Sequence, residues 1–277
     1  MKTNLPFDVN LSIMFTEIPL LQRPAAAKDT GFDAVEFWWP FTEAVPADRD
    51  VDAFVRAVSD AGVRLVGLNF FAGDMPGGDR GTVSWPARSQ EFRDNIDVLI
   101  GIAEATGCRA FNALYGNRTD EDDPRSQDEL AVDNLSLAAK RVDAIRGVVL
   151  IESCAKEGQP RYPLLTARDA IGVIDRVREA SGATNLRFLA DLFHLASNGE
   201  DLPEVIRTYA DRIGHVQIAD VPGRHQPGTG DLDFESLFAE LESAGYRGYV
   251  GCEYKPIGAS AESFDWLPRE QRGSPAH

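Results

Sequence analysis

The sequence alternates eight times between short apolar segments and longer amphipathic segments, and this alternation limits the fold more than any other feature. The short segments are rich in β-branched and aromatic residues, which predicts strands, whereas the longer ones have the spacing of helices. We expect strands over residues 7–14, 34–39, 64–71, 109–115, 147–154, 186–193, 213–219 and 248–254. We expect helices over residues 20–28, 51–61, 89–106, 126–145, 167–180, 202–211 and 234–244. Strands joined by such helices pair in parallel, because each crossover returns the chain to the same end of the sheet.

The chain length fits a closed barrel. Division of 277 residues among eight units gives about 35 residues per unit, enough for a strand and a crossover helix. No long linker interrupts the pattern, and no G-x-G-x-x-G motif follows the first strand, which argues against a dinucleotide-binding sheet. We therefore predict an α/β fold, a single (β/α)₈ barrel over residues 1–277, with a flexible tail at residues 266–277. The long irregular stretches 73–85 and 117–125 are expected over the carboxyl-terminal mouth, where barrel enzymes place their active sites.

The net charge is strongly negative, with 28 Lys and Arg against 44 Asp and Glu, which gives −16. Nucleic acid and anionic membrane surfaces are therefore not expected partners, since both bind through basic surfaces. No run of about 18 apolar residues is present to span a bilayer, and no signal peptide is recognised, so we expect a cytoplasmic protein. The three cysteines, Cys108, Cys154 and Cys252, are widely spaced and are expected to be reduced and buried.

Polar residues lie toward the carboxyl end of seven predicted strands, although barrel strands are buried on both faces. They are Glu36, Asn69, Asn112, Glu152, Asp191, Gln217 and Glu253. Taken alone, Glu36 or Asn112 is best interpreted as a single polar group whose hydrogen bonds are satisfied. His215, two residues before Gln217 and deeper in the barrel, is interpreted in the same way. All seven strand-end side chains are expected to converge on one mouth.

Four of these residues predict a metal site: Glu152, Asp191, Gln217 and Glu253. Three carboxylates crowded into a small, poorly solvated volume repel one another unless they are protonated or share a cation. An all-oxygen set suits Mg²⁺ or Mn²⁺ better than zinc, which prefers thiolate and imidazole ligands. Glu152 and Glu253 are also natural acid and base groups for moving a proton on a bound carbonyl compound.

Further residues at the mouth are candidates for binding a substrate. His194 follows Asp191 by three residues and is placed to contact a substrate oxygen, although a partly exposed loop histidine is the alternative. Arg224 follows the seventh strand and Lys255 follows the eighth; each is able to hold a carboxylate or enolate oxygen, or is simply a solvated surface charge. Asn69 at the end of the third strand completes this set.

Several segments resemble the hydroxypyruvate isomerase family, which belongs to the xylose isomerase-like barrels and includes the 2-oxo-tetronate isomerases. The most specific are His215-Val216-Gln217-Ile218-Ala219-Asp220, Pro227-Gly228-Thr229-Gly230 and Gly251-Cys252-Glu253-Tyr254-Lys255-Pro256. Residues 10–15, 31–37 and 90–94 also match, and the resemblance extends from about residue 7 to 266.

The resemblance implies isomerisation of a small hydroxy-keto acid, such as hydroxypyruvate to tartronate semialdehyde, through a metal-stabilised cis-enediolate. It implies that Glu152 and Glu253 are catalytic, and that these two residues bind a metal together with Asp191 and Gln217. After the fifth strand the family commonly has Glu-Pro-Ile-Asn, whereas this chain has Glu152-Ser153-Cys154-Ala155, and the loop over residues 73–85 differs too. Both departures bear on the substrate rather than on the chemistry.

Other functions remain open at the level of the sequence. A ketose 3-epimerase or another sugar isomerase would use the same metal and glutamates, and a direct hydride shift is the alternative to proton transfer. A barrel endonuclease would need a histidine-rich zinc cluster and a basic surface, but the chain has four histidines. A non-catalytic barrel would have no reason to keep costly buried carboxylates. The partner is expected to be a small molecule, and a homo-oligomer is compatible with the sequence.

Overall fold

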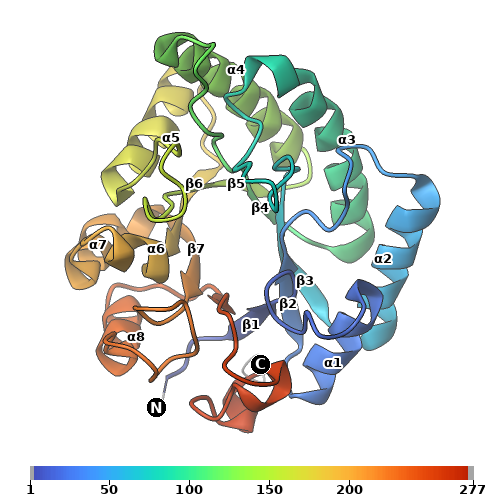
Figure 1. Cartoon of the computed structure of the whole chain (residues 1–277), viewed down its shortest axis with the longest axis vertical. Coiled ribbons are helices and arrows are strands. Elements are labelled where there is room, and N and C mark those ends of the chain that lie inside the picture. Colours follow the sequence, from blue (N-terminus) through green and yellow to red (C-terminus); the bar gives the residue numbers. More distant parts are fainter. Residues whose placement is uncertain (1–2, 274–277) are drawn as a thin grey trace.

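The computed structural model describes residues 3–273, and in it eight parallel strands close into a barrel in the order β1 to β8 (Figure 1). The strands are β1 (Phe7–Asn10), β2 (Ala34–Phe37), β3 (Arg64–Asn69), β4 (Ala110–Asn112), β5 (Val148–Glu152), β6 (Leu186–Asp191), β7 (Ile213–Ile218) and β8 (Val250–Cys252). Each strand pairs with the next in the sequence, and β8 pairs with β1. The predicted closed (β/α)₈ barrel is confirmed.

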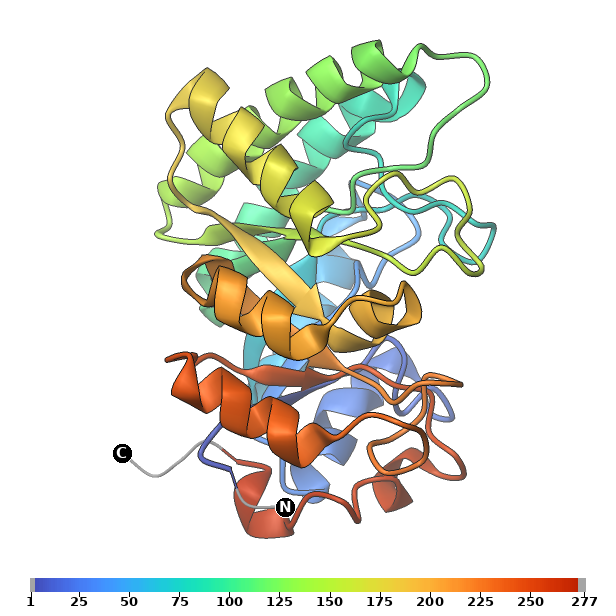
Figure 2. The ribbon, with the colours of Figure 1, turned by 90° about the vertical axis from the view of Figure 1, so that its left-hand side faces the viewer.

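The helices form a ring outside the strands, and the long connections gather on the side to which the strands point (Figure 2). The helices are α1 (Arg23–Asp29), α2 (Asp48–Ala61), α3 (Ser89–Thr106), α4 (Pro124–Asp143), α5 (Ala167–Ser181), α6 (Leu192–Ser197), α7 (Leu202–Tyr209) and α8 (Phe234–Ser243). None of the helices within residues 3–273 combines the length and apolar character needed to cross a membrane. Cys108, Cys154 and Cys252 are buried and free, as expected.

Some predicted strands end earlier than expected, which affects the site. β1 stops at Asn10 instead of residue 14, because the backbone turns there and the Met14 amide donates to the Asn10 carbonyl at 3.1 Å. β6 stops at Asp191, and the apolar residues after it form the short helix α6, which the periodicity did not predict. The Asp191 side chain caps this helix by accepting from the backbone amides of Phe193 and His194, at 2.9 and 3.3 Å.

The segment after β8 lies in the place of an eighth outer helix, between α8 and α1 (Figure 1). Phe264 is fully buried against Phe32, with ring centroids 4.7 Å apart. Beyond it, Leu267 is buried, and Arg272 donates to the carbonyls of Thr30, Phe264 and Leu267. Residues 266–273 therefore pack against the barrel instead of forming part of a free tail, and residues 274–277 lie outside the described part of the chain.

Candidate functional site

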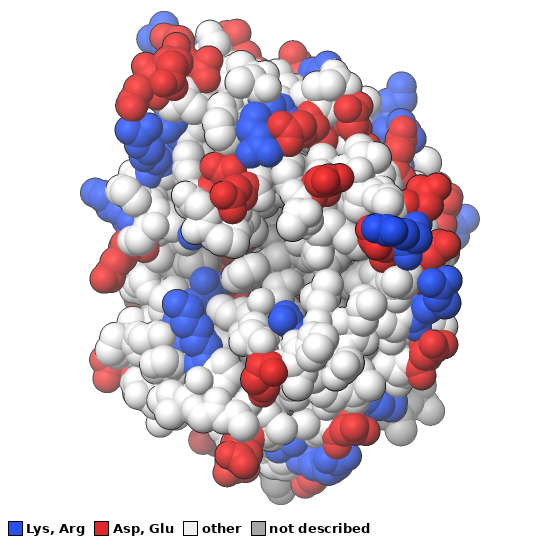
Figure 3. Space-filling model, turned by 45° about the vertical axis from the view of Figure 1, so that its right-hand side comes forward, with Lys and Arg blue, Asp and Glu red and all other residues white. Residues whose placement is uncertain are grey.

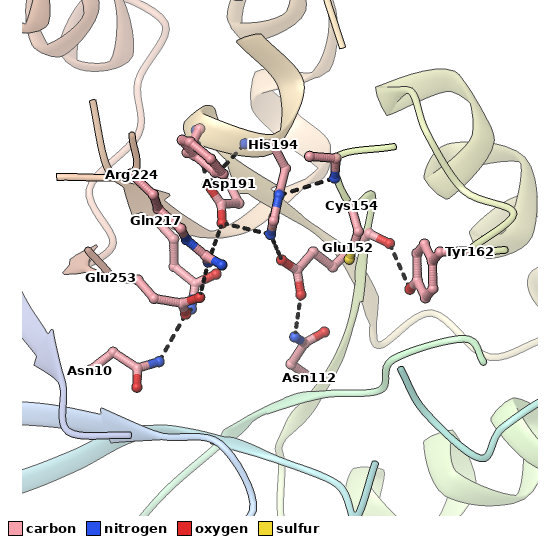
Figure 4. A network of polar contacts seen from close by, with 12 residues as sticks. Asn10, Asn112, Glu152, Cys154, Tyr162, Asp191, His194, Gln217, Arg224 and Glu253 are labelled. Carbon is pink, nitrogen blue, oxygen red and sulfur yellow. Dashed lines mark hydrogen bonds and ion pairs between the residues drawn. The ribbon is translucent and has the colours of Figure 1, made fainter. Parts of the chain in front are cut away.

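The strand-end residues converge because the barrel register brings them to one level. Asp191 pairs with Gln217, and Gln217 in turn pairs with Gly251, two residues before Glu253. Glu152 is the last residue of β5. The side chains of Glu152, Asp191, Gln217 and Glu253 are all buried and point toward one another (Figure 4). The structure thus brings together the four residues that the sequence predicted as metal ligands.

Neutral amides hold the two glutamates in place. The Asn112 amide donates to Glu152 Oε2 at 2.7 Å. The amides of Asn10 and Gln217 donate to Glu253 Oε2 at 2.8 and 2.5 Å. These contacts leave one oxygen of each glutamate turned toward the centre of the group, Glu152 Oε1 beside His194 and Glu253 Oε1 beside Arg224.

Burial and mutual repulsion make the charged forms of these carboxyl groups unfavourable. Burial, and after it the negative charge of Asp191, raise the pKa of Glu152 to about 8. Burial also raises the pKa of Glu253 well above its usual range, although the Arg224 guanidinium opposes this shift. Groups with such pKa values are stabilised as anions when a cation joins them.

The donor set fits a hard divalent cation. Besides three carboxylates, the set contains Gln217 Oε1, which is buried and has no hydrogen-bond partner among the described residues. An orphaned carbonyl oxygen next to carboxylates is the ligand chemistry that Mg²⁺ or Mn²⁺ uses. Glu152, Cys154 and His194 also lie close enough to share an ion. However, burial raises the pKa of Cys154 well above the usual thiol range, which disfavours the thiolate that zinc would need.

His194 lies on α6 and is buried, so the exposed loop position considered from the sequence is wrong. Its Nδ1 accepts the backbone N–H of Ala155 at 3.0 Å, so the neutral ring carries its proton on Nε2. Nε2 lies 3.4 Å from Asp191 Oδ2 and 3.7 Å from Glu152 Oε1. Burial lowers the pKa of His194 to about 4, although the Asp191 charge opposes the shift. The ring therefore presents a hydrogen-bond donor to the site.

Arg224 also reaches the site. Its guanidinium contacts Glu253 and lies 3.4 Å from Asp191 Oδ2, and it stacks 5.1 Å above the ring centre of Phe193. Burial alone would lower the pKa of Arg224, but the charges of Glu253 and Asp191 outweigh it and raise the pKa. Arg224, whose side chain is 15% exposed, is thus a partner of the carboxylates and not a solvated surface charge.

The two other predicted substrate-binding residues, Asn69 and Lys255, differ in their position relative to the cavity. Asn69 lines the cavity above the carboxylates. Lys255 has an exposed side chain outside the residues that line this cavity, and its contact with the site is a backbone hydrogen bond to the Arg224 carbonyl at 2.7 Å. The expectation that the Lys255 side chain binds substrate is therefore not supported by its position.

The cavity has a volume of about 740 Å³ and opens as a hollow on the molecular surface (Figure 3). Glu152, Glu253, His194 and Arg224 line it, together with an aromatic group made of Trp38, Trp39, Phe41 and Phe71. Arg80, on the loop after β3, lines it as well. The sequence reasoning did not assign this arginine a role.

Asn10, also missed, carries the same signal as the seven strand-end residues that were noticed. It is a polar residue at the end of a buried strand, but the predicted continuation to residue 14 obscured that position. Glu36 and His215, interpreted as satisfied core groups, form a buried ion pair with 2.7 Å between Oε2 and Nε2. Burial opposes the charge on His215, but Glu36 raises the pKa of this histidine to about 9.

Comparison with known proteins places the fold in a family. The model of the xylose isomerase-like TIM barrel family matches residues 24–270. The chain belongs to this family. A Streptomyces coelicolor protein named as a candidate hydroxypyruvate isomerase is 55% identical over 97% of both chains. The hydroxypyruvate isomerase of Escherichia coli is 33% identical over 95% of this chain and 98% of its own length.

Two further relatives bear on the range of the family. The 2-oxo-tetronate isomerase of Pectobacterium atrosepticum is 31% identical over 94% of this chain and 95% of its own length. A crystal structure from Brucella melitensis, titled AP endonuclease, family 2, is 35% identical, with a TM-score of 0.86 over 95% of this chain and 98% of that one. The curated relatives are isomerases, and this chain is an enzyme of their family.

Proposed function

We propose that this family member interconverts the ketone and aldehyde forms of a small hydroxy-keto acid, with hydroxypyruvate or a 2-oxo-tetronate as substrate. The names of the relatives that match nearly the whole chain support this substrate class. The observation that carries the proposal is the group of three buried carboxylates beside an unpartnered amide oxygen, with two of the carboxylates on glutamates.

Glu152, Asp191, Gln217 and Glu253 would hold a divalent cation, Mg²⁺ or Mn²⁺. Such a cation polarises a carbonyl group and makes the neighbouring C–H bond more acidic. One of the two glutamates removes the proton from the carbon that carries the hydroxyl group, which leaves the substrate as an enediolate. The other glutamate, or the same one, delivers a proton to the adjacent carbon, while the hydroxyl proton moves to the former ketone oxygen. No redox cofactor takes part in this sequence.

Other residues orient the substrate. The Nε2 proton of His194 is available to donate to a substrate oxygen, because Ala155 occupies Nδ1. Arg224 supplies a positive charge for a carboxylate or enediolate oxygen. Asn69 offers a further hydrogen bond from the cavity wall. The anionic substrate is attracted by the positive charge of Arg224 and of the cation against the net charge of the whole protein.

The test is a substrate panel with protein that has been stripped with EDTA and then refilled with Mg²⁺ or Mn²⁺. We expect turnover of hydroxypyruvate or a 2-oxo-tetronate that is lost on stripping and restored by the metal. Turnover of ketohexoses together with failure on every three- and four-carbon oxo acid would replace the proposal with a ketose 3-epimerase. Cleavage of abasic DNA would instead support a nuclease.

A further inference from the structure

We propose that Glu36, on β2 beside the cluster of buried carboxylates, is a positioning residue. It turns the carbonyl oxygen of Gln217 toward the cation. This inference rests on the proposed metal site. It assigns a role to a residue that is not itself a ligand and that the sequence marked only as a satisfied core group.

Gln217 is held by the nitrogen end of its side chain. Nε2 donates to Glu36 Oε1 at 2.7 Å and to Glu253 Oε2 at 2.5 Å. The two ends of a carboxamide have nearly the same shape, so its orientation is decided by its hydrogen-bond partners. A carbonyl oxygen between two carboxylate oxygens would be repelled by both. Nε2 must therefore lie between these two carboxylate oxygens, and Oε1 must point away from them.

The oxygen of this carboxamide is therefore the atom that is available to bind a cation. Gln217 Oε1 is buried and has no partner among the described residues. Asn10 provides an internal comparison, because its Nδ2 donates to the same two oxygens, Glu36 Oε1 and Glu253 Oε2, at 3.0 and 2.8 Å. Its own carbonyl oxygen, however, accepts the Ser12 amide at 3.0 Å. Of these two matched amides, Gln217 is the one left with a free acceptor.

Glu36, and not Glu253, is the lasting partner of this amide. A cation at the site would bind the carboxylate of Glu253, and this would weaken the hydrogen bond that Gln217 Nε2 donates to it. Glu36 is not one of the proposed ligands, so its oxygens are not shared with the cation in this way. Its Oε1 accepts from the two amides, and its Oε2 is occupied by His215 at 2.7 Å.

The strands beside Glu36 leave room for its side chain. A Cβ atom at Gly251 would lie 2.8 Å from Glu36 Oε1, and one at Gly67 would lie 3.0 Å from Glu36 Oε2. Both distances are shorter than ordinary contacts, so a larger residue at either position would force the Glu36 carboxylate to shift.

The experiment is calorimetric titration of the EDTA-stripped protein with Mn²⁺, which reads metal affinity without turnover. Glu36→Leu removes the acceptor, and we expect its Kd to rise by about 10- to 100-fold, as for other residues that orient metal ligands. Glu36→Gln keeps an acceptor oxygen for both amides and turns its nitrogen to a neutral His215, so we expect an affinity close to wild type. Asp8→Asn is the matched control, because Asp8 is equally buried nearby and its oxygens have no hydrogen-bond partner among the described residues.

A folded Glu36→Leu variant that binds Mn²⁺ as tightly as wild type would overturn the inference. So would equal weakening in Glu36→Gln and Asp8→Asn, because the effect would then come from buried charge alone. Failure of the wild-type protein to bind Mn²⁺ or Mg²⁺ would instead refute the proposed metal site.

A second measurement covers the case in which Glu36→Leu does not fold. In wild-type protein with ¹⁵N-labelled glutamine, we expect the Gln217 Nε2 protons to stay protected from exchange when Mg²⁺ is added. Loss of that protection would mean that the amide turns its nitrogen end away from Glu36, and would overturn the inference.

Discussion

At the scale of single residues, hydrogen bonds decide which polar atom of each side chain is left free at the site. Gln217 and His194 are the two cases with consequences for chemistry. In each, one polar atom is already occupied, by Glu36 for the amide and by the Ala155 amide for the imidazole. The remaining atom is thereby fixed as an acceptor in Gln217 and as a donor in His194.

The tautomer of His194 follows from this geometry. In protein with ¹⁵N-labelled histidine, we expect the His194 ring at pH 7 to be neutral, with its proton on Nε2 and an unprotonated Nδ1. His225 serves as the comparison, because its Nδ1 donates to the Lys255 carbonyl at 2.7 Å and should therefore carry the proton on the opposite nitrogen. A proton found on Nδ1 of His194 would contradict the donor role proposed for Nε2.

At the scale of elements, one carboxylate fixes the backbone conformation of the loop that carries Arg224. Asp220 follows β7, is fully buried, and accepts five backbone N–H groups. The donors are Val221, Gly228, Thr229, Gly230 and Leu232, at 2.8 to 3.1 Å. Gly230 is needed here because a Cβ atom would lie 2.3 Å from the Val221 carbonyl oxygen. This explains physically why the aspartate and the Pro-Gly-Thr-Gly segment occur together.

Removal of this acceptor should disorganise the loop. Hydrogen bonds to a charged group contribute about 1.5–3 kcal/mol each, so we expect Asp220→Ala to lower the free energy of unfolding by at least about 3 kcal/mol. Turnover should also fall, because Arg224 loses its fixed position. Urea unfolding measures the first effect, with the exposed Asp231→Ala in the same loop as control. A loss no larger than that of the control would contradict this role.

At the scale of the whole molecule, the segment after β8 takes the place of an outer helix and completes the layer that surrounds the strands. The polar, proline- and glycine-containing sequence beyond residue 266 gave no helical periodicity, and we expected a free tail. The packing instead depends on single anchors, Leu267 in the core and Arg272 on carbonyls of the neighbouring segments. Such anchors leave no periodic signal in a sequence.

Leu267 tests this packing. Truncation of a buried leucine to alanine costs about 2–5 kcal/mol, and we expect a loss of this size for Leu267→Ala in chemical unfolding. Leu21→Ala, at a side chain that is 46% exposed, should change stability by less than about 0.5 kcal/mol. Equal stability of the two variants would mean that the segment is not part of the folded barrel.

The sequence was sufficient for the barrel because strand and helix periodicities repeat in every unit. It was also sufficient to predict that Glu152, Asp191, Gln217 and Glu253 lie together at one mouth, since a polar residue at the end of an apolar strand can be recognised from the sequence alone. It was not sufficient for α6, whose apolar residues continue the strand pattern, nor for Lys255, whose direction depends on the turn after β8. The orientation of Gln217 depends on Glu36, which lies far from it in the sequence.

Glu152 and Glu253 are proposed to transfer the proton at a metal site on this barrel. The most direct test is kcat of Glu152→Gln and Glu253→Gln on the accepted oxo acid, at a metal concentration shown by titration to saturate each variant. We predict that kcat falls at least about 100-fold in both variants, as is typical when a positioned acid–base group is removed. Turnover near the wild-type rate in either variant, with the metal bound, would contradict the account.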